Sequence, residues 1–86
     1  MSKLPYDELE RKLTDAHKRS VGSRWQHYKG DMYIIANIAI MEDNGEIAVI
    51  YSPLDHTKVS FVRPITAWAE LVEWKGHQVP RFSKMN

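Results

Sequence analysis

Residues 25 to 30 are the part of the sequence richest in side chains that could do chemistry. His27 lies there between Trp25 and Tyr28, directly before a Lys-Gly pair. A histidine can move a proton near neutral pH, hold a metal ion or form hydrogen bonds. None of the four histidines stands at a metal-ligand spacing from another histidine or a carboxylate. We therefore expect His27 either to donate a hydrogen bond to a backbone carbonyl or to line a binding site.

A second group of residues combines positive charge with aromatic rings. Arg63 and Lys29 could hold a phosphate. Tyr33, Tyr51 or Trp25 could then stack on a base or a sugar. For every aromatic residue the alternative is a place in the hydrophobic core. The combination favours a non-catalytic module that binds a nucleotide-like or other small anionic ligand.

The sequence contains no residue set that defines an enzyme. It has no cysteine, and its four glycines are too far apart to form a phosphate-binding loop. A hydrolase with His27 as general base and Glu46 as its orienting carboxylate is the weakest alternative, because no nucleophile or metal set supports it. We predict no cofactor and no metal site.

Composition limits the class of protein further. Eighty-six residues make one small domain, 1–86. Twelve Lys and Arg against 11 acids give a net charge of +1, which argues against nucleic acid as a partner. The apolar stretch 32–41 is too short to span a membrane, and the first residues do not resemble a signal peptide. With no cysteine either, we expect a soluble, cytoplasmic protein without membrane contact.

Residues 5 to 20 are predicted to form one amphipathic helix. Pro5 suits the first helical position, and Gly22 stands where a helix should stop. Acidic residues fill the first turns and basic residues the last, which matches the helix dipole. Apolar residues recur along one side at helical spacing: Tyr6, Leu9, Leu13 and Ala16. This narrow stripe must dock on the protein's own sheet or on a second copy of the chain.

The sequence beyond residue 22 predicts antiparallel hairpins. Turn-forming pairs alternate with segments rich in Trp, Tyr, Ile and Val. Asn44-Gly45 suits a two-residue type I′ turn, which would pair Met41 with Ala48. A second hairpin around Leu54-Asp55 would place Glu46 opposite Arg63.

The remaining segments complete a small barrel. Strand 31–41 is apolar on both faces, so it needs a cover or a tightly curled sheet. Pro64 ends the next strand, residues 65–69 form one helical turn, and Lys75-Gly76 connects a last hairpin. Five or six short strands preceded by one helix favour an SH3-like antiparallel barrel.

Several motifs resemble those of a bacterial and phage family called domain of unknown function 1653. Its opening motif, aromatic-x-His-aromatic-Lys-Gly-x-x-Tyr, is similar to residues 25–33, and its closing motif is similar to residues 79–82. The resemblance covers residues 24–82 and implies a small β-barrel without an established activity. The family's characteristic polar and aromatic positions are occupied here by His27, Lys29, Tyr33, Glu46, Tyr51 and Arg63. We take these six as the candidate ligand-binding residues.

The chain also departs from the family pattern. Ile40-Met41 stands where the family usually has an Arg-His pair, and Asp55-His56 replaces a Tyr-Gly loop. If the Arg-His pair helps to bind an anion, part of that site is absent here. The helix at 5–20 lies outside the resemblance. The alternative function is therefore a protein-interaction or nucleic-acid-binding adaptor that forms homo-oligomers through this helix.

Overall fold

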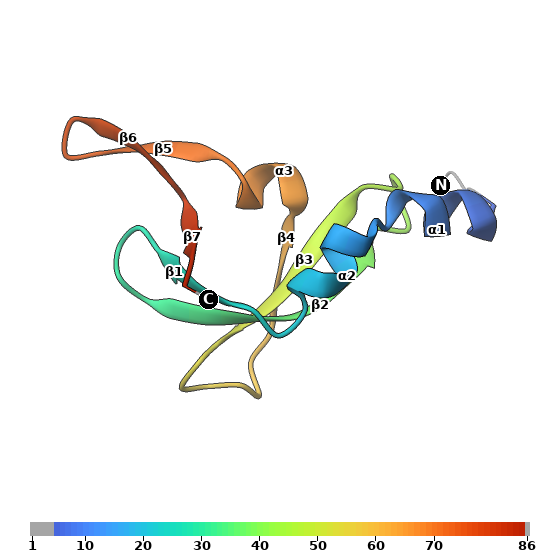
Figure 1. Ribbon diagram of the computed structural model, residues 1–86, viewed down its shortest axis with the longest axis horizontal. Coiled ribbons are helices and arrows are strands. Elements are labelled where there is room, and N and C mark those ends of the chain that lie inside the picture. Colours follow the sequence, from blue (N-terminus) through green and yellow to red (C-terminus); the bar gives the residue numbers. More distant parts are fainter. Residues whose placement is uncertain (1–4, 86) are drawn as a thin grey trace.

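The structure is a computed structural model that describes residues 5–85, and it is mostly β (Figure 1). Its strands are β1 (Arg24–His27), β2 (Met32–Ile40), β3 (Ile47–Pro53), β4 (Phe61–Pro64), β5 (Leu71–Trp74), β6 (His77–Pro80) and β7 (Phe82–Lys84). Its helices are α1 (Tyr6–Lys12), α2 (Asp15–Ser20) and α3 (Ile65–Trp68). No helix within residues 5–85 has the length and apolar character that a membrane span requires.

Five strands form one antiparallel sheet in the order β4-β3-β2-β1-β7, and β5 and β6 form a separate hairpin. The larger sheet curls strongly. Arg63 on β4 and Phe82 on β7 belong to opposite edge strands, yet the Arg63 Cζ lies 5.7 Å from the centre of the Phe82 ring. Within residues 5–85 the strand order is nevertheless linear, and β4 does not pair with β7. The helices α1 and α2 and the β5–β6 hairpin lie at opposite ends of the molecule (Figure 1).

The core lies between the curled sheet and α3. Its buried members come from β2, β3, α3 and β7: Ile35, Val49, Tyr51, Trp68 and Phe82. The predicted helical turn after Pro64 is confirmed as α3, and it carries Trp68 into this core. The predicted last hairpin is also confirmed: Lys75 and Gly76 both adopt positive φ, 53° and 83°, as a tight type I′ connection requires.

The predicted single helix over residues 5–20 is wrong, because the segment forms two short helices. The chain is extended at Thr14, whose side chain accepts a hydrogen bond from the His17 N–H. The His17 ring in turn accepts one from the Thr14 N–H, which completes a capping box. A competing N-cap inside the apolar stripe therefore starts a new helix. Tyr6, the first residue of that stripe, is 87% exposed.

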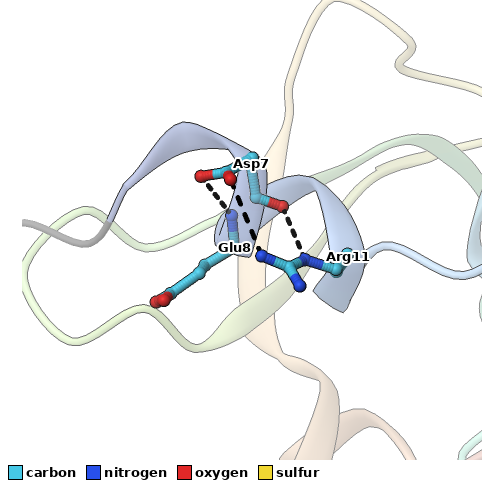
Figure 2. A network of polar contacts seen from close by, with 3 residues as sticks. All are labelled: Asp7, Glu8 and Arg11. Carbon is cyan, nitrogen blue, oxygen red and sulfur yellow. Dashed lines mark hydrogen bonds and ion pairs between the residues drawn. The ribbon is translucent and has the colours of Figure 1, made fainter.

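The first helix is held by local contacts and by a hydrogen bond to the connection between β2 and β3. Asp7 accepts a hydrogen bond from the Glu8 N–H, and its carboxylate lies 3.7 Å from Arg11 (Figure 2). Both side chains of this ion pair are about three-quarters exposed, so it stabilises the helix only weakly. Lys12 donates to the Gly45 carbonyl at 2.9 Å, which ties α1 to the β2–β3 connection.

The predicted two-residue turn at Asn44-Gly45 is also wrong. Residues 42–45 form a four-residue loop, and the Met41 N–H donates to the Glu46 carbonyl instead of facing Ala48. Gly45 has φ +72°, but Lys75 is the only non-glycine with positive φ within residues 5–85. Asn44 therefore lacks the conformation of a type I′ turn. Its side chain accepts a hydrogen bond from the Glu46 N–H, the usual alternative for an Asn in a turn.

The predicted cross-strand pair of Glu46 and Arg63 does not form. Arg63 lies opposite Val49, three residues further along β3. The cause is the β3–β4 connection, which runs from residue 54 to residue 60. It contains two successive turns, closed by hydrogen bonds from His56 to Pro53 and from Val59 to His56. The connection is thus longer than the tight turn expected at Leu54-Asp55, and the register shifts with it.

Candidate ligand-binding site

Phe82 is the centre of an aromatic cluster that gathers most of the candidate residues. Its ring is only 4% exposed and stacks on Trp68 at 3.8 Å with an interplanar angle of 8°. Three further rings approach it edge-on at centroid distances of 5.1 to 5.8 Å: His27, Tyr33 and Tyr51. Edge-to-face packing of this kind suits the positive edges and negative faces of aromatic rings. The cluster therefore fixes the orientation of each ring.

Arg63 completes the cluster from the edge strand β4. Its Nε donates to the Tyr51 hydroxyl at 3.3 Å, and its guanidinium lies over the Phe82 ring. The side chain is half-buried, and its two terminal nitrogens make no hydrogen bond or ion pair within residues 5–85. A guanidinium that is held at one end and open at the other is suited to bind a carboxylate or a phosphate.

His27 lies in a region of positive potential. Burial lowers the pKa of the half-buried imidazole, and the charges of Arg81, Arg63 and Lys29 lower it further, while Asp31 opposes them. Its Nδ1 accepts a hydrogen bond from the Lys29 N–H at 3.2 Å, which leaves Nε2 to carry the proton of the neutral ring. The ring thus bonds to the backbone as an acceptor, whereas the sequence led us to expect that His27 donates to a backbone carbonyl.

Tyr33 brings a phenol to the same cluster. Burial raises its pKa, as do the charges of Asp31 and Tyr51, whereas Arg63 opposes the rise. The phenol therefore keeps its proton at neutral pH and can donate a hydrogen bond. Its ring packs edge-on against Tyr51 at 5.4 Å.

Two of the six candidate residues lie outside the cluster. Glu46 accepts a hydrogen bond from the Thr66 hydroxyl at 3.1 Å, and its contacts include neither His27 nor Arg63 within residues 5–85. Lys29 is exposed, with its Nζ 5.8 Å from the centre of the Tyr28 ring. The structure thus brings His27, Tyr33, Tyr51 and Arg63 together and leaves Glu46 and Lys29 apart.

Sequence reasoning missed two residues that shape this cluster. Phe82 was not among the candidate residues, yet it is the ring that the other side chains share. Arg81 was not among the candidate residues either, but it is half-buried and forms an ion pair with Glu70 at 3.4 Å. Its Nε is buried without a hydrogen-bond partner within residues 5–85. Both residues lie in the closing motif of the family resemblance, which was the available signal.

The other histidines have local roles. His17 belongs to the capping box, and His56 lies 3.1 Å from the Asp55 carboxylate in the β3–β4 connection. Among residues 5–85, no group of three or more His, Asp and Glu side chains could hold a metal ion.

The fold and the cluster define a small, mostly β domain whose curled sheet gathers aromatic rings and one arginine around a phenylalanine. The chain belongs to the family described as protein of unknown function (DUF1653), whose model matches residues 23–84. It is similar to the crystal structure of a DUF1653 protein from Bordetella bronchiseptica, with a TM-score of 0.64 and 26% sequence identity over 78% of this chain and 88% of that one. None of the curated proteins matches the chain.

Proposed function

We propose that this domain is a non-catalytic module that binds a small anionic ligand of nucleotide type at the Arg63 cluster. The observation that carries the proposal is the guanidinium of Arg63, fixed by Tyr51 and Phe82 and with its terminal nitrogens unbonded within residues 5–85. A phosphate bound there would replace water with a charge-assisted pair of hydrogen bonds. The half-buried Tyr33 and His27 beside it supply a ring face and a hydrogen-bond donor.

The charges around the cluster support an anion in preference to a cation. Arg81, Arg63 and Lys29 all act on His27, and among residues 5–85 only the acid Asp31 opposes them. Arg81 is partly neutralised by Glu70, whereas Arg63 and Lys29 form no ion pair within residues 5–85. The potential at the cluster is therefore positive although the chain as a whole is almost neutral, with a net charge of +1.

The test is a thermal-shift and calorimetric screen of the full chain against mono-, di- and trinucleotides and inorganic phosphate. A ligand present at about 100 times its dissociation constant stabilises the folded state by about 2.7 kcal/mol. Arg63→Gln should weaken binding about 10- to 150-fold, because it removes a hydrogen bond to a charged group. Arg19→Gln, the same charge change on exposed α2, serves as the control and should bind normally.

A second readout follows from the electrostatics of His27. A bound anion offsets the neighbouring positive charges, so the lowered pKa of His27 should rise when ligand binds. Proton NMR of the imidazole measures this directly. If no nucleotide or phosphate changes the melting temperature of the wild-type chain, or if Arg63→Gln binds as tightly as Arg19→Gln, the proposal is wrong.

We also infer that the curled sheet is an SH3-like barrel left open between β4 and β7. Arg63 on β4 lies close to Phe82 on β7, which supports a sheet curled far enough to bring its two edge strands near each other. The opening between these edges is where the cluster lies, and small barrels commonly bind ligands at such a mouth.

A second candidate function is an adaptor that self-associates through α1. Tyr6 is 87% exposed, and beside it lies a hollow of about 390 Å³ with an apolar lining from Pro5, Leu9, Ile40 and Met41. A second copy of the chain could bury both. Sedimentation of the full chain should then show a dimer that Tyr6→Glu dissociates and Val59→Glu, in the β3–β4 connection, does not. A monomer at all concentrations would eliminate this function.

A further inference from the structure

The β5–β6 hairpin stands apart from the curled sheet (Figure 1). A two-stranded hairpin is marginally stable on its own, so its position depends on contacts with the rest of the domain. The Tyr28 N–H donates to the Arg81 carbonyl at 3.0 Å, and the rings of Tyr28 and Trp74 meet at 5.2 Å with an interplanar angle of 71°. The hairpin is thereby held against the end of β1 by one aromatic pair.

A hollow of about 260 Å³ lies between the hairpin and β1. Its volume falls just below the roughly 300–1,000 Å³ of sites for drug-sized ligands, which leaves room for one ring system and not for a larger molecule. The lining combines ring faces with hydrogen-bonding groups: Gln26, His27, Tyr28, Trp74, Pro80 and Ser83. Trp74 remains 36% exposed even though it packs on Tyr28. Tryptophan is enriched at binding surfaces, because it combines a large apolar ring with an N–H donor.

Two lysines lie close to aromatic rings that line this hollow. Lys29, in the β1–β2 turn, has its Nζ 5.8 Å from the Tyr28 ring centre. Lys75, in the β5–β6 turn, has its Nζ 5.4 Å from the Trp74 ring centre. Neither forms an ion pair with a carboxylate within residues 5–85. Two positive charges therefore lie beside the two aromatic rings of the lining.

We propose that the hollow binds one unpaired base of a single-stranded nucleic acid, while Lys29 and Lys75 contact phosphates on either side of that base. Aromatic platforms with a basic rim are how proteins hold single strands without reading their sequence. A proline-rich peptide also fits aromatic grooves. The two lysines without carboxylate partners favour the polyanion. With only two phosphate contacts, binding would be weak, which agrees with the near-neutral charge of the chain.

This proposal goes beyond the small-ligand function, because it concerns a polymeric partner and a different surface. His27 contacts both surfaces, through Tyr28 on one side and Phe82 on the other, and the charge of Lys29 acts on both. Arg63 and Trp74 each belong to one surface, so variants of these two residues let the two proposals fail independently.

The experiment is fluorescence anisotropy of the full-length chain with labelled single-stranded DNA and RNA oligonucleotides of about 10 nucleotides, long enough to cover one such site. The logarithm of affinity should fall with the logarithm of salt concentration. Replacing both lysines, Lys29→Gln with Lys75→Gln, should reduce that slope by about 1.4, at about 0.7 for each phosphate contact. The control pair Lys18→Gln with Lys58→Gln removes the same charge from exposed positions elsewhere and should keep the slope.

The stacking contact is tested separately. Trp74→Leu should weaken binding about 5- to 150-fold, and Trp74→Phe should restore most of it. Circular dichroism checks that each variant is folded. Arg63→Gln should leave oligonucleotide binding unchanged while it removes the small ligand. Wild-type affinity and salt slope in the Lys29/Lys75 variant would overturn the proposal, as would binding of a proline-rich peptide without binding of either nucleic acid.

Discussion

Arg63 acts on its neighbours as well as on any ligand. Its charge lowers the pKa of His27 and opposes the rise in the pKa of Tyr33. These influences exist because both rings pack on Phe82, over which the guanidinium also lies. Arg63 thus favours the neutral form of the His27 imidazole, whereas at Tyr33 it partly offsets the burial that keeps the phenol protonated.

The imidazole of His27 should make folding sensitive to mild acid. The pKa of the folded-state imidazole is lowered below its ordinary value of 6.5, mainly by burial, so the unfolded chain binds the proton more readily. The free energy of unfolding should therefore fall as pH drops through 6.5 toward the lowered pKa. Urea unfolding at about pH 7.5 and about pH 5.5 measures this fall, which should be smaller in His27→Gln. An NMR titration midpoint of His27 at or above 6.5 would contradict the prediction.

At the scale of elements, the connections between strands decide which side chains meet. Two connections are longer than the sequence predicted. In the β2–β3 connection the Asn44 side chain accepts a hydrogen bond from the Glu46 N–H, and the β3–β4 connection contains a second turn after the one that begins at Pro53. The first change moves Met41 opposite Glu46, and the second moves Arg63 opposite Val49. The β2 strand adds a bulge between Ile35 and Asn37, which shifts its register against β3 by one residue.

The β5–β6 turn offers a test of backbone strain without steric change. Gly76 has φ +83°, and a Cβ built there would meet no atom within 4 Å. Gly76→Ala should therefore destabilise the domain by about 1–3 kcal/mol through strain alone. Gly76→Asn should cost less, because Asn tolerates this conformation. Urea unfolding measures both variants, and equal stability of Gly76→Ala and the wild type would show that the turn is not constrained.

At the scale of the whole molecule, a small core holds a strongly curled sheet. The buried cluster joins β2, β3, α3 and β7, so it links the edge strand β7 to the centre of the sheet and to α3. A domain of this size buries little more than half of its unfolded surface. Its stability therefore depends on a few large side chains, with Trp68 and Phe82 foremost.

The two phenylalanines provide a matched pair for measuring this dependence. Phe82 is 4% exposed and Phe61 is 45% exposed. Phe82→Ala should cost about 3–5 kcal/mol, a large part of the total stability of a small domain. Phe61→Ala should cost much less, because its ring is half in solvent already. Chemical unfolding of both variants checks the difference, and similar losses would mean that the cluster around Phe82 does not hold the sheet.

Much of the fold could be predicted because the signals were local. The positions of most strands, the helical turn after Pro64 and the hairpin at Lys75-Gly76 follow from residues within a few positions of one another. The break between the two helices at Thr14 also has a local cause. It was missed because a capping box usually has Glu or Gln three residues after the N-cap, whereas His17 stands there in this sequence. The six candidate ligand-binding residues came from the family resemblance, and their role in binding stays a prediction.

The sequence by itself determined the class of domain, its family and the polar and aromatic residues from which a site could be made. Only the tertiary structure decided which of them meet. Phe82 and Arg63 are distant in the chain and lie on opposite edge strands, and their contact depends on the curvature of the whole sheet. Such contacts result from register and packing across several strands, whereas sequence patterns report mainly on neighbours. The same reason explains why Trp74 and Tyr28 could be recognised as facing one another only once the hairpin was seen beside β1.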